Sequence, residues 1–523
     1  MMSSKHRFLL GTFFVSALLV LIVAGTTVGP RAELLQKSAF ADDRPASQPL
    51  KPASKPVKEE TWNVIYLGGQ RIGHQQSAIE TVLQNGTPIV KTSTVTNMTI
   101  KRFNQSMVIR QLLTTEETQD GDLRRFRFEM ANPPAAPQVT SGQIEGKNLT
   151  LVKEVNGQSK TKVQPWQPDV KSPVYQDRLL KENPLKAGET RSFETFVPDF
   201  AKAGKMTLKG IGFEDVKLLN ETSRKLFKVS CTHALIPGIA TDSFQDEKGD
   251  TIKVSMNMIG STTEMFLVSR EEALKNITGT ELDLAVTTLV KVKPILKGHE
   301  SKRIVYRVTI ANQNPVDAIP TGDTQTIKRL TDETAELTVV SIPIPASAKV
   351  GRVAAEFLES SQYLQRDDER VQTRATNAAG NATDPAEIAW RMEKYVHEKL
   401  VNKDFSTAMA SAAEVAEKME GDCTEHAVLL AAMLRAKGIP SRVVVGLVYA
   451  ERLFAFGGHM WTEANLNGHW IPLDATLGMR GIGAAHIKLA DSSLSDDGPA
   501  GISGVVPLMT VIGNLKLDIV SVE

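Results

Sequence analysis

The amino-acid sequence predicts a multidomain protein in which a large antiparallel β region is followed by a smaller α+β domain. Three observations support this prediction. The chain has 523 residues, a length that suits about three domains. Residues 61–290 alternate apolar and polar side chains between turn-forming pairs such as Asn85-Gly86 and Asp120-Gly121, a pattern typical of antiparallel strands. From residue 351 onward, apolar residues recur at helical spacing before further strand-like runs, which indicates helices packed on a sheet.

Residues 1–41 are predicted to be a signal peptide or an N-terminal membrane helix that acts as an anchor. Basic residues at 5–7 precede an apolar run at 8–24, and Ala39-Phe40-Ala41 has the form of a cleavage site. Cleavage and retention therefore both stay open. In either case the bulk of the chain is expected to be exported, and so to be periplasmic, otherwise extracytoplasmic, or anchored in the membrane. Residues 42–60, rich in Pro, Ser and Lys, are predicted to form a flexible linker.

The predicted antiparallel β domain spans residues 61–290, and a small β module is predicted at residues 291–350. We find no nucleophile set, metal-ligand cluster or phosphate-binding loop in the sequence of the β domain. Presenting substrate, binding a partner or acting as a spacer are the roles that stay open for it. Cys231 lies in an alternating strand pattern, which favours a place in the core over a catalytic role. At the end of the chain, residues 491–523 are predicted to form a loop and a closing β-strand.

The composition excludes some classes of protein. Lys and Arg number 61 against 60 Asp and Glu, a balance that argues against a general nucleic-acid binder. The chain has two cysteines, Cys231 and Cys423, whereas an exported protein held together by disulfides would normally carry more. We therefore expect no structural disulfide, and we predict no cofactor and no metal ion.

Helix signals are dense in the predicted α+β domain, residues 351–490. Residues 353–365 and the alanine-rich stretch 406–419 are expected to be helical, and Asp384-Pro385 has the N-cap and proline pair that begins a helix. These helices are expected to pack against a short sheet and to deliver the chain to a cysteine at the start of the next helix.

Asp422 and Glu425 form a capping-box pattern in front of an apolar helical run. Cys423 is therefore predicted to be the first residue of a buried helix. The helix dipole and the N–H groups of the first turn favour the thiolate over the thiol at this position. A cysteine there alone would fit a small core residue equally well.

His459 and Asp474 make the catalytic interpretation stronger. His459 begins an alternating strand, Asn467-Gly468 is a hairpin turn, and the returning strand carries Asp474 back toward His459. We interpret Cys423 as a thiol nucleophile, His459 as its base and Asp474 as the group that orients the base. His426, three residues after Cys423, is an alternative base or one ligand of a metal site.

Three short motifs resemble those of the transglutaminase-like superfamily, which is related to papain-type thiol enzymes. They are Gly421-Asp422-Cys423, His459-x-Trp461-x-Glu463 and Asp474-Ala475-Thr476, and the resemblance covers roughly residues 375–490. It implies a papain-like catalytic domain in which Cys423, His459 and Asp474 have the roles given above. The superfamily includes amide-crosslinking enzymes, proteases, deamidases, glycan-removing amidases and inactive members.

The expected function is that of an exported thiol enzyme that acts on amide bonds, by transglutaminase-like acyl transfer or by amide or peptide hydrolysis. Its expected partner is a protein or peptide substrate with amide groups, together with a membrane if the N-terminal helix is retained. A cysteine protease with the same triad is one alternative. A non-catalytic envelope binding protein with a vestigial triad is another, and the complete set of three residue types argues against it.

Overall fold

The structure is a computed structural model, and it describes residues 59–102, 105–258, 260–276, 283, 288–496, 508 and 511–523. The predicted signal peptide or membrane anchor lies outside the described residues, as does the predicted linker except for its last two residues. None of the helices in the described ranges is both long enough and apolar enough to cross a membrane.

Among the described residues, fourteen strands form one antiparallel sheet, which we call the large sheet. Its strand order is β8-β7-β6-β5-β4-β3-β2-β1-β14-β13-β12-β11-β10-β9. The large antiparallel β region predicted from the sequence is therefore confirmed. The strands are β1 (Glu59–Leu67), β2 (Gln70–Gln84), β3 (Thr87–Arg102), β4 (Gln105–Thr118), β5 (Leu123–Ala131), β6 (Gln138–Glu145), β7 (Asn148–Val155), β8 (Gln158–Pro165), β9 (Thr190–Val197), β10 (Lys202–Lys217), β11 (Ser223–His233), β12 (Ala240–Gln245), β13 (Thr251–Met258) and β14 (Ser261–Val268).

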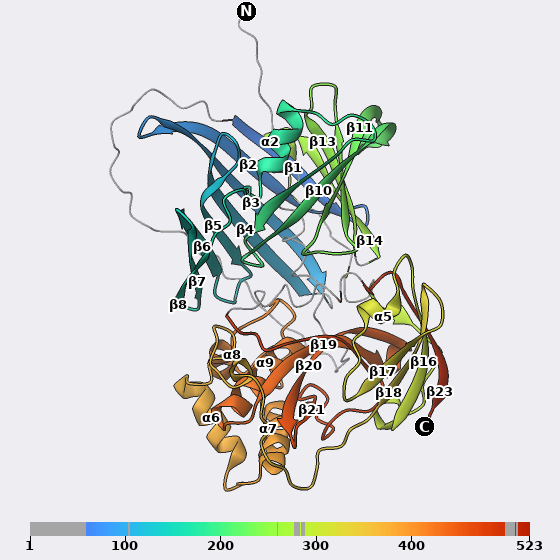
Figure 1. The fold of residues 1–523 in the computed structure, drawn as a ribbon. Helices are drawn as coiled ribbons and strands as arrows, with labels where there is room; N and C mark the ends of the chain where they lie inside the picture. Colours follow the sequence, from blue (N-terminus) through green and yellow to red (C-terminus); the bar gives the residue numbers. More distant parts are fainter. Residues whose placement is uncertain are drawn as a thin grey trace, which may run out of the picture.

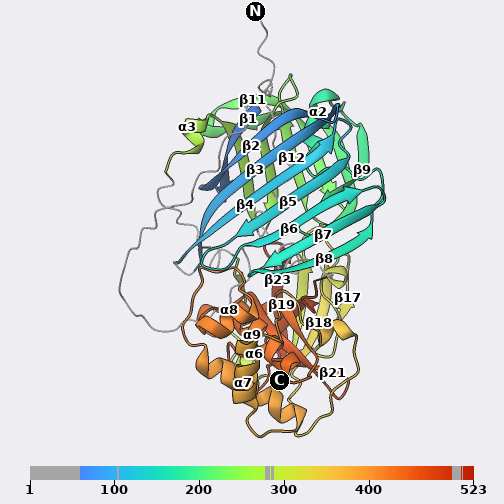
Figure 2. The same ribbon diagram turned by 90° about the vertical axis from the view of Figure 1, so that its left-hand side faces the viewer.

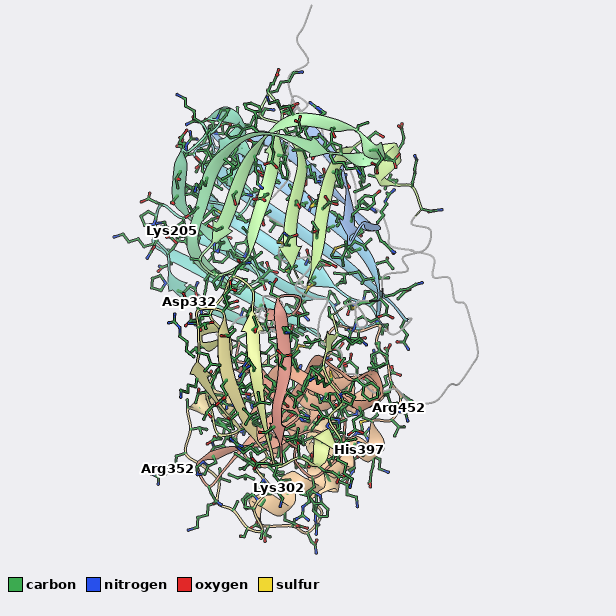
Figure 3. All side chains as sticks on the ribbon, turned by 90° about the vertical axis from the view of Figure 1, so that its right-hand side faces the viewer. Lys205, Lys302, Asp332, Arg352, His397 and Arg452 are labelled. Atoms are coloured by element: carbon green, nitrogen blue, oxygen red, sulfur yellow. The ribbon has the colours of Figure 1, made fainter. Side chains whose placement is uncertain are left out.

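The large sheet curves so that its first eight strands form one wall and its last six form the other (Figures 1 and 2). Figure 3 shows the second wall from outside, with long side chains spread over it. Helix α2 (Tyr175–Glu182) lies at the end of the two walls that points away from the second half of the chain, at the top of Figure 1. Alternate residues of β3 and β4 are buried, as expected for strands with one face toward a core.

The opposite end of the large sheet meets the second half of the chain, where helices pack on a smaller sheet (Figure 1). Among the described residues this central sheet has the order β15-β20-β19-β22, with β21 paired to β20. The strands are β15 (Val290–Lys291), β19 (Ser441–Ala450), β20 (Ala455–Leu466), β21 (His469–Leu473) and β22 (His486–Ser492). Helix α9 (Cys423–Ala436) packs on β19 and β20, and almost every residue of it is buried.

Three more helices, α6 (Glu369–Ala379), α7 (Pro385–Lys399) and α8 (Ala412–Lys418), contact α9. A third sheet lies beside them with the order β17-β18-β16-β23 in the described part of the chain. Its strands are β16 (Arg303–Ile310), β17 (Gln325–Arg329), β18 (Thr334–Val340) and β23 (Leu515–Val522). The last strand of the chain thus pairs with β16, about two hundred residues earlier in sequence.

Of the helices predicted from the sequence, one was wrong and one was too long. Residues 353–365 contain one turn of 3₁₀ helix, Ala355–Phe357, and otherwise run irregularly. The alanine-rich stretch 406–419 becomes helical only at Ala412, where α8 begins. Backbone N–H groups of residues 405 and 408 bond to side chains of the large sheet, which holds this segment out of a helix.

Candidate active site

Cys423 begins helix α9, as the capping pattern predicts. Asp422 is the N-cap: its Oδ1 accepts a hydrogen bond from the Thr424 backbone N–H at 2.8 Å. Glu425 completes the capping box, because its Oε2 accepts from the Asp422 N–H at 2.9 Å. The Cys423 side chain is 1% exposed, so the thiol lies inside the protein.

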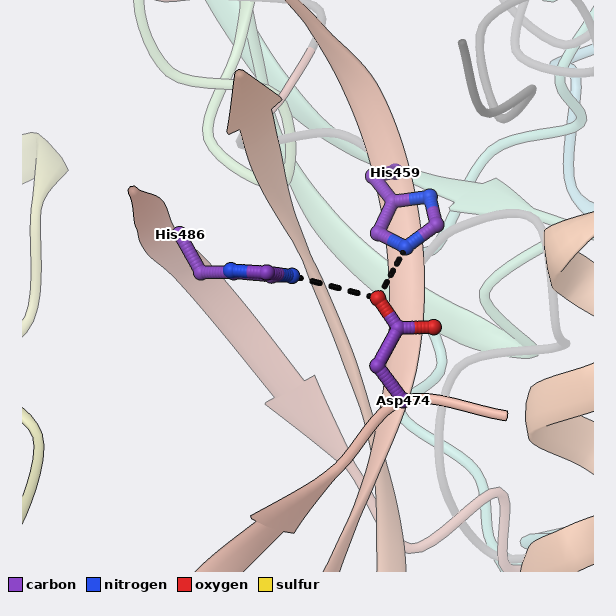
Figure 4. Close-up of side chains that lie close together, drawn as sticks. All are labelled: His459, Asp474 and His486. Atoms are coloured by element: carbon purple, nitrogen blue, oxygen red, sulfur yellow. Dashed lines mark hydrogen bonds and ion pairs between the residues drawn. The ribbon is translucent and has the colours of Figure 1, made fainter. Parts of the chain in front are cut away.

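His459 and Asp474 come together through the predicted hairpin. Strands β20 and β21 pair in antiparallel register and are joined by Asn467 and Gly468, whose φ angles of 56° and 85° are those of a tight primed turn. Asp474 follows β21 directly. Its Oδ2 lies 2.8 Å from Nε2 of His459, and both side chains are 1% exposed (Figure 4). The structure therefore places the predicted base against the predicted orienting carboxylate.

The third predicted residue, Cys423, faces this pair. Its thiol interacts with the His459 ring and with the backbone N–H of Met460, and both interactions favour the thiolate. Because Nε2 of His459 is taken by Asp474, Nδ1 is the ring atom through which a proton can pass to or from sulfur. The structure thus brings Cys423, His459 and Asp474 together.

Burial and nearby charges both shift the pKa values of these groups. Burial, and after it the charge of Asp422, raise the pKa of the Cys423 thiol. The helix N-terminus alone predicts a lowered pKa, and the direction found here is the opposite. Burial lowers the pKa of His459, but the negative charge of Asp474, followed by that of Cys423, raises it to about 10. The site therefore stabilises the imidazolium strongly.

Asp474 is held as a carboxylate by several donors. Burial raises its pKa, yet the two histidines beside it bring its pKa well below the usual value. Its Oδ1 accepts from the backbone N–H of Thr476 at 2.9 Å. Its own backbone N–H donates to Oε1 of Glu393, on α7, at 3.0 Å. Glu393 also accepts from the N–H of Gly481 at 3.1 Å, so one buried carboxyl fixes both ends of this turn.

A second histidine, His486, contacts the same carboxylate and was missed by the sequence analysis. Its Nε2 lies 3.1 Å from Asp474 Oδ2 (Figure 4). It arrives on β22, whose pairing with β19 sets His486 opposite Val448. No local pattern around His486 indicates this contact, because it depends on the order of strands in the central sheet. The indole of Trp461 packs against both imidazoles, with ring centroids 6.2 Å from His459 and 5.5 Å from His486.

His426, the alternative base, is engaged elsewhere. Its Nδ1 lies 2.6 Å from the Asp422 carbonyl oxygen, and its Nε2 lies 3.2 Å from the Lys403 amine. Burial and then the charge of Lys403 lower its pKa to about 3, which keeps the ring neutral. Among the described residues, no hydrogen bond joins His426 to Asp474.

Ligand atoms of His459, Asp474 and His486 lie within 4.8 Å of one another, close enough for a metal ion to be considered. Both Nε2 atoms stand at hydrogen-bond distance from the same Asp474 oxygen, at 2.8 and 3.1 Å. The arrangement is the one expected of two N–H donors sharing a carboxylate, and it supports a role in holding His459.

Residues 372–475 match the sequence model of the transglutaminase-like superfamily. The match contains the three predicted residues, and the chain therefore carries a transglutaminase-like domain in this range. No curated protein sequence matches the chain significantly.

Several solved structures are similar to parts of the chain. One is a putative cysteine protease from Cytophaga hutchinsonii, with 18% identity and a TM-score of 0.30, covering 43% of this chain and 90% of its own. Another is a β-barrel-like protein of unknown function from Brucella abortus, with 13% identity and a TM-score of 0.29, covering 41% of this chain and 96% of its own. A third is a putative protease from Parabacteroides distasonis, with 14% identity and a TM-score of 0.18, covering 68% of this chain and 64% of its own.

Proposed function

We propose that this chain is an exported thiol enzyme that acts on amide bonds through Cys423, His459 and Asp474. The observation that carries the proposal is the buried His459–Asp474 contact of 2.8 Å facing a cysteine at the start of α9, inside a transglutaminase-like domain. Nucleophile, base and orienting acid in mutual reach are the requirement for nucleophilic catalysis at a carbonyl.

In the first half of the reaction the Cys423 sulfur attacks the carbonyl carbon of an amide. His459, holding the proton that the thiol has released, gives it to the amide nitrogen as the carbon–nitrogen bond breaks, and an amine leaves. The products are a thioester on Cys423 and a neutral His459. Asp474 stabilises the imidazolium while it exists, and the positive end of α9 favours the negative oxygen of the tetrahedral intermediate.

In the second half His459 takes a proton from water or from an amine, and the resulting nucleophile attacks the thioester. The carbon–sulfur bond breaks, the sulfur leaves as a thiolate and the proton on His459 restores the starting pair. Water produces a carboxylic acid, which is hydrolysis, whereas an amine produces a new amide, which is acyl transfer. The same residues support both outcomes, and a protease is the case in which the amide is a peptide bond.

Access to the sulfur needs a change in the neighbouring chain, since Cys423 and His459 are each 1% exposed. A closed site excludes water from the charged pair and strengthens its electrostatic interactions. Substrate binding is therefore expected to open the site and to be required for rapid acylation. The basic and then apolar sequence of residues 5–24 supports export of the chain.

The test uses the full chain and its Cys423→Ala variant, each incubated with cell-envelope proteins and a labelled primary amine. Mass spectrometry then reads new carboxyl ends, amide losses and amine incorporation, and intact mass detects a thioester on Cys423. Activity in the folded Cys423→Ala variant would contradict the proposal. A second arm treats the native protein with a thiol-reactive probe near neutral pH: a Cys423 that reacts only after unfolding, with no turnover of any kind, supports the binding-protein alternative.

A further inference from the structure

An arginine of the large sheet contacts the N-cap of α9, the helix that begins with Cys423. Arg102 is the last residue of β3, and its Nη2 lies 2.5 Å from Oδ2 of Asp422. Its Nη1 donates to the backbone carbonyl of Thr407 at 3.2 Å. Both side chains of the ion pair are 1% exposed, so solvent screens their charges little. A residue 320 positions earlier in sequence thus contacts the cap of the helix that begins with Cys423.

Two more side chains, at the same ends of neighbouring strands of the large sheet, form hydrogen bonds with the segment before α8. Gln105, the first residue of β4, accepts a hydrogen bond from the Phe405 N–H at 2.7 Å. Asn132, directly after β5, donates to the Ser406 carbonyl at 3.2 Å and accepts from the Ala408 N–H. The contact between the two halves of the chain at this point is therefore specific and hydrogen-bonded.

Asp422 uses its two carboxylate oxygens for two purposes. Oδ1 accepts from the Thr424 N–H and caps α9, whereas Oδ2 faces Arg102. The carboxylate adjoins Cys423 in sequence, and after burial its charge is the next influence that raises the pKa of the thiol. Arg102 supplies the opposite charge at this carboxylate.

We propose that Arg102 is a positioning residue of the active site, through which the large sheet neutralises Asp422 and so sets how readily Cys423 becomes a thiolate. The inference rests on the proposed function, because it takes Cys423 as the nucleophile. It assigns the large sheet a part in the chemistry: if Arg102 leaves, an uncompensated carboxylate remains beside the sulfur. An ion pair that served packing alone would not change the titration of the thiol.

Other ionisable groups face the same place from the elements around it. Glu425, on α9, has its pKa raised by burial and then by the charge of Asp422. His459, on β20, faces the thiol and favours the thiolate. Lys403, in the segment before α8, interacts with the charges of both Cys423 and Asp422. None of these three residues is substituted in the variants that test the proposal.

The test follows the ionisation of Cys423 in the full chain with Arg102→Gln, with Asp422→Asn, with both, and with Gln105→Ala. Thiolate is measured across pH by its ultraviolet absorbance, as the difference from each protein carrying Cys423→Ala, and by the rate of alkylation with iodoacetamide. Arg102→Gln should raise the midpoint by about one unit, since a nearby charge shifts a pKa by about one to three units. Asp422→Asn should lower it, and the asparagine still caps α9.

The double variant should return close to the wild-type midpoint, because it lacks both charges. Gln105→Ala is the matched control: it breaks a hydrogen bond from the same sheet edge, removes no charge and should leave the midpoint in place. An unchanged midpoint in folded Arg102→Gln would overturn the inference, as would a double variant no closer to wild type than Arg102→Gln.

Folding is checked by circular dichroism. If Arg102→Gln does not fold, Asp422→Asn decides, and an unchanged midpoint in that variant overturns the inference. A shift in Gln105→Ala as large as that in Arg102→Gln also overturns it, because docking and not charge would then control the thiol. A wild-type Cys423 that does not titrate, in a protein that shows no turnover, would instead remove the proposed function on which the inference rests.

Discussion

Replacing Asp474 by Asn tests the core of the proposed site. The change keeps the size of the side chain and a possible hydrogen bond to His459, but it removes the negative charge that lies 2.8 Å from Nε2. Burial by itself lowers the pKa of His459, and the charge of Asp474 is the first influence that raises it to about 10. Without that charge the pKa of His459 should fall toward its ordinary value of 6.5, while the charge of Cys423 still raises it.

The size of the expected effect follows from this fall. A drop of the His459 pKa from about 10 to 6.5 corresponds to at most roughly 5 kcal/mol of lost imidazolium stabilisation, at about 1.4 kcal/mol for each unit. Part of this loss affects the resting enzyme as well as the transition state, so it does not all appear in the rate. We therefore expect a decrease in kcat on the order of ten- to a thousand-fold, equal to roughly 1.4–4 kcal/mol.

Two measurements check this prediction: kcat and KM across pH, and the pKa of His459 from NMR of ring-labelled histidine. Asp491→Asn is the matched control, because Asp491 lies on β22 and contacts Arg442 on the protein surface, not His459. The reasoning is refuted if Asp474→Asn keeps full activity while His426→Ala abolishes it in a folded protein. An unchanged pKa of His459 would refute it as well.

Three further predictions concern other buried residues. Cys231→Ala should keep full activity and cost about 1 kcal/mol of stability, as measured by urea unfolding, because Cys231 is buried away from the site and burial raises its thiol pKa to about 12. Glu393→Gln should make stability less dependent on pH. Burial raises the pKa of Glu393 from 4.5 to about 7, so in this pH interval the folded state binds a proton that the unfolded state has released. The free energy of unfolding of the wild type should therefore fall by roughly 3 kcal/mol as pH rises through the interval, whereas that of the variant should not. A variant that declines equally would be evidence against this assignment. His486→Gln should lower kcat by no more than about ten-fold, less than Asp474→Asn, and should lower the His459 pKa less; a larger loss than that of Asp474→Asn would give His486 a direct role.

The residues of the candidate site could be found from the sequence because each is marked by local chemistry. The capping box around Cys423 involves neighbours two and three residues apart, and the structure forms both of its hydrogen bonds. The Asn467-Gly468 turn sets the register of β20 and β21, which brings Asp474 back to His459. Short-range hydrogen bonding and strand alternation need only a few consecutive residues, so the primary structure contains them.

Other features of the site depend on residues far apart in the chain. His486 reaches Asp474 only because β22 lies beside β19 in the central sheet, a strand order that no turn dipeptide indicates. The pKa of Cys423 rises because α9 is buried on all sides, and this reverses what the helix start alone predicts. Burial is a property of the assembled layers, and a sequence pattern around one residue does not contain it.

The sequence by itself thus determined the antiparallel character of the large β region, the start of α9 and the identity of Cys423, His459 and Asp474 as candidates. Only the tertiary structure decided that residues 405–408 stay out of a helix and that Arg102 pairs with Asp422. The physical reason is the cost of burying a charge or a backbone N–H without a partner. Packing avoids that cost where it places a suitable hydrogen-bond or ion-pair partner, and here the partners lie roughly three hundred residues apart in the sequence.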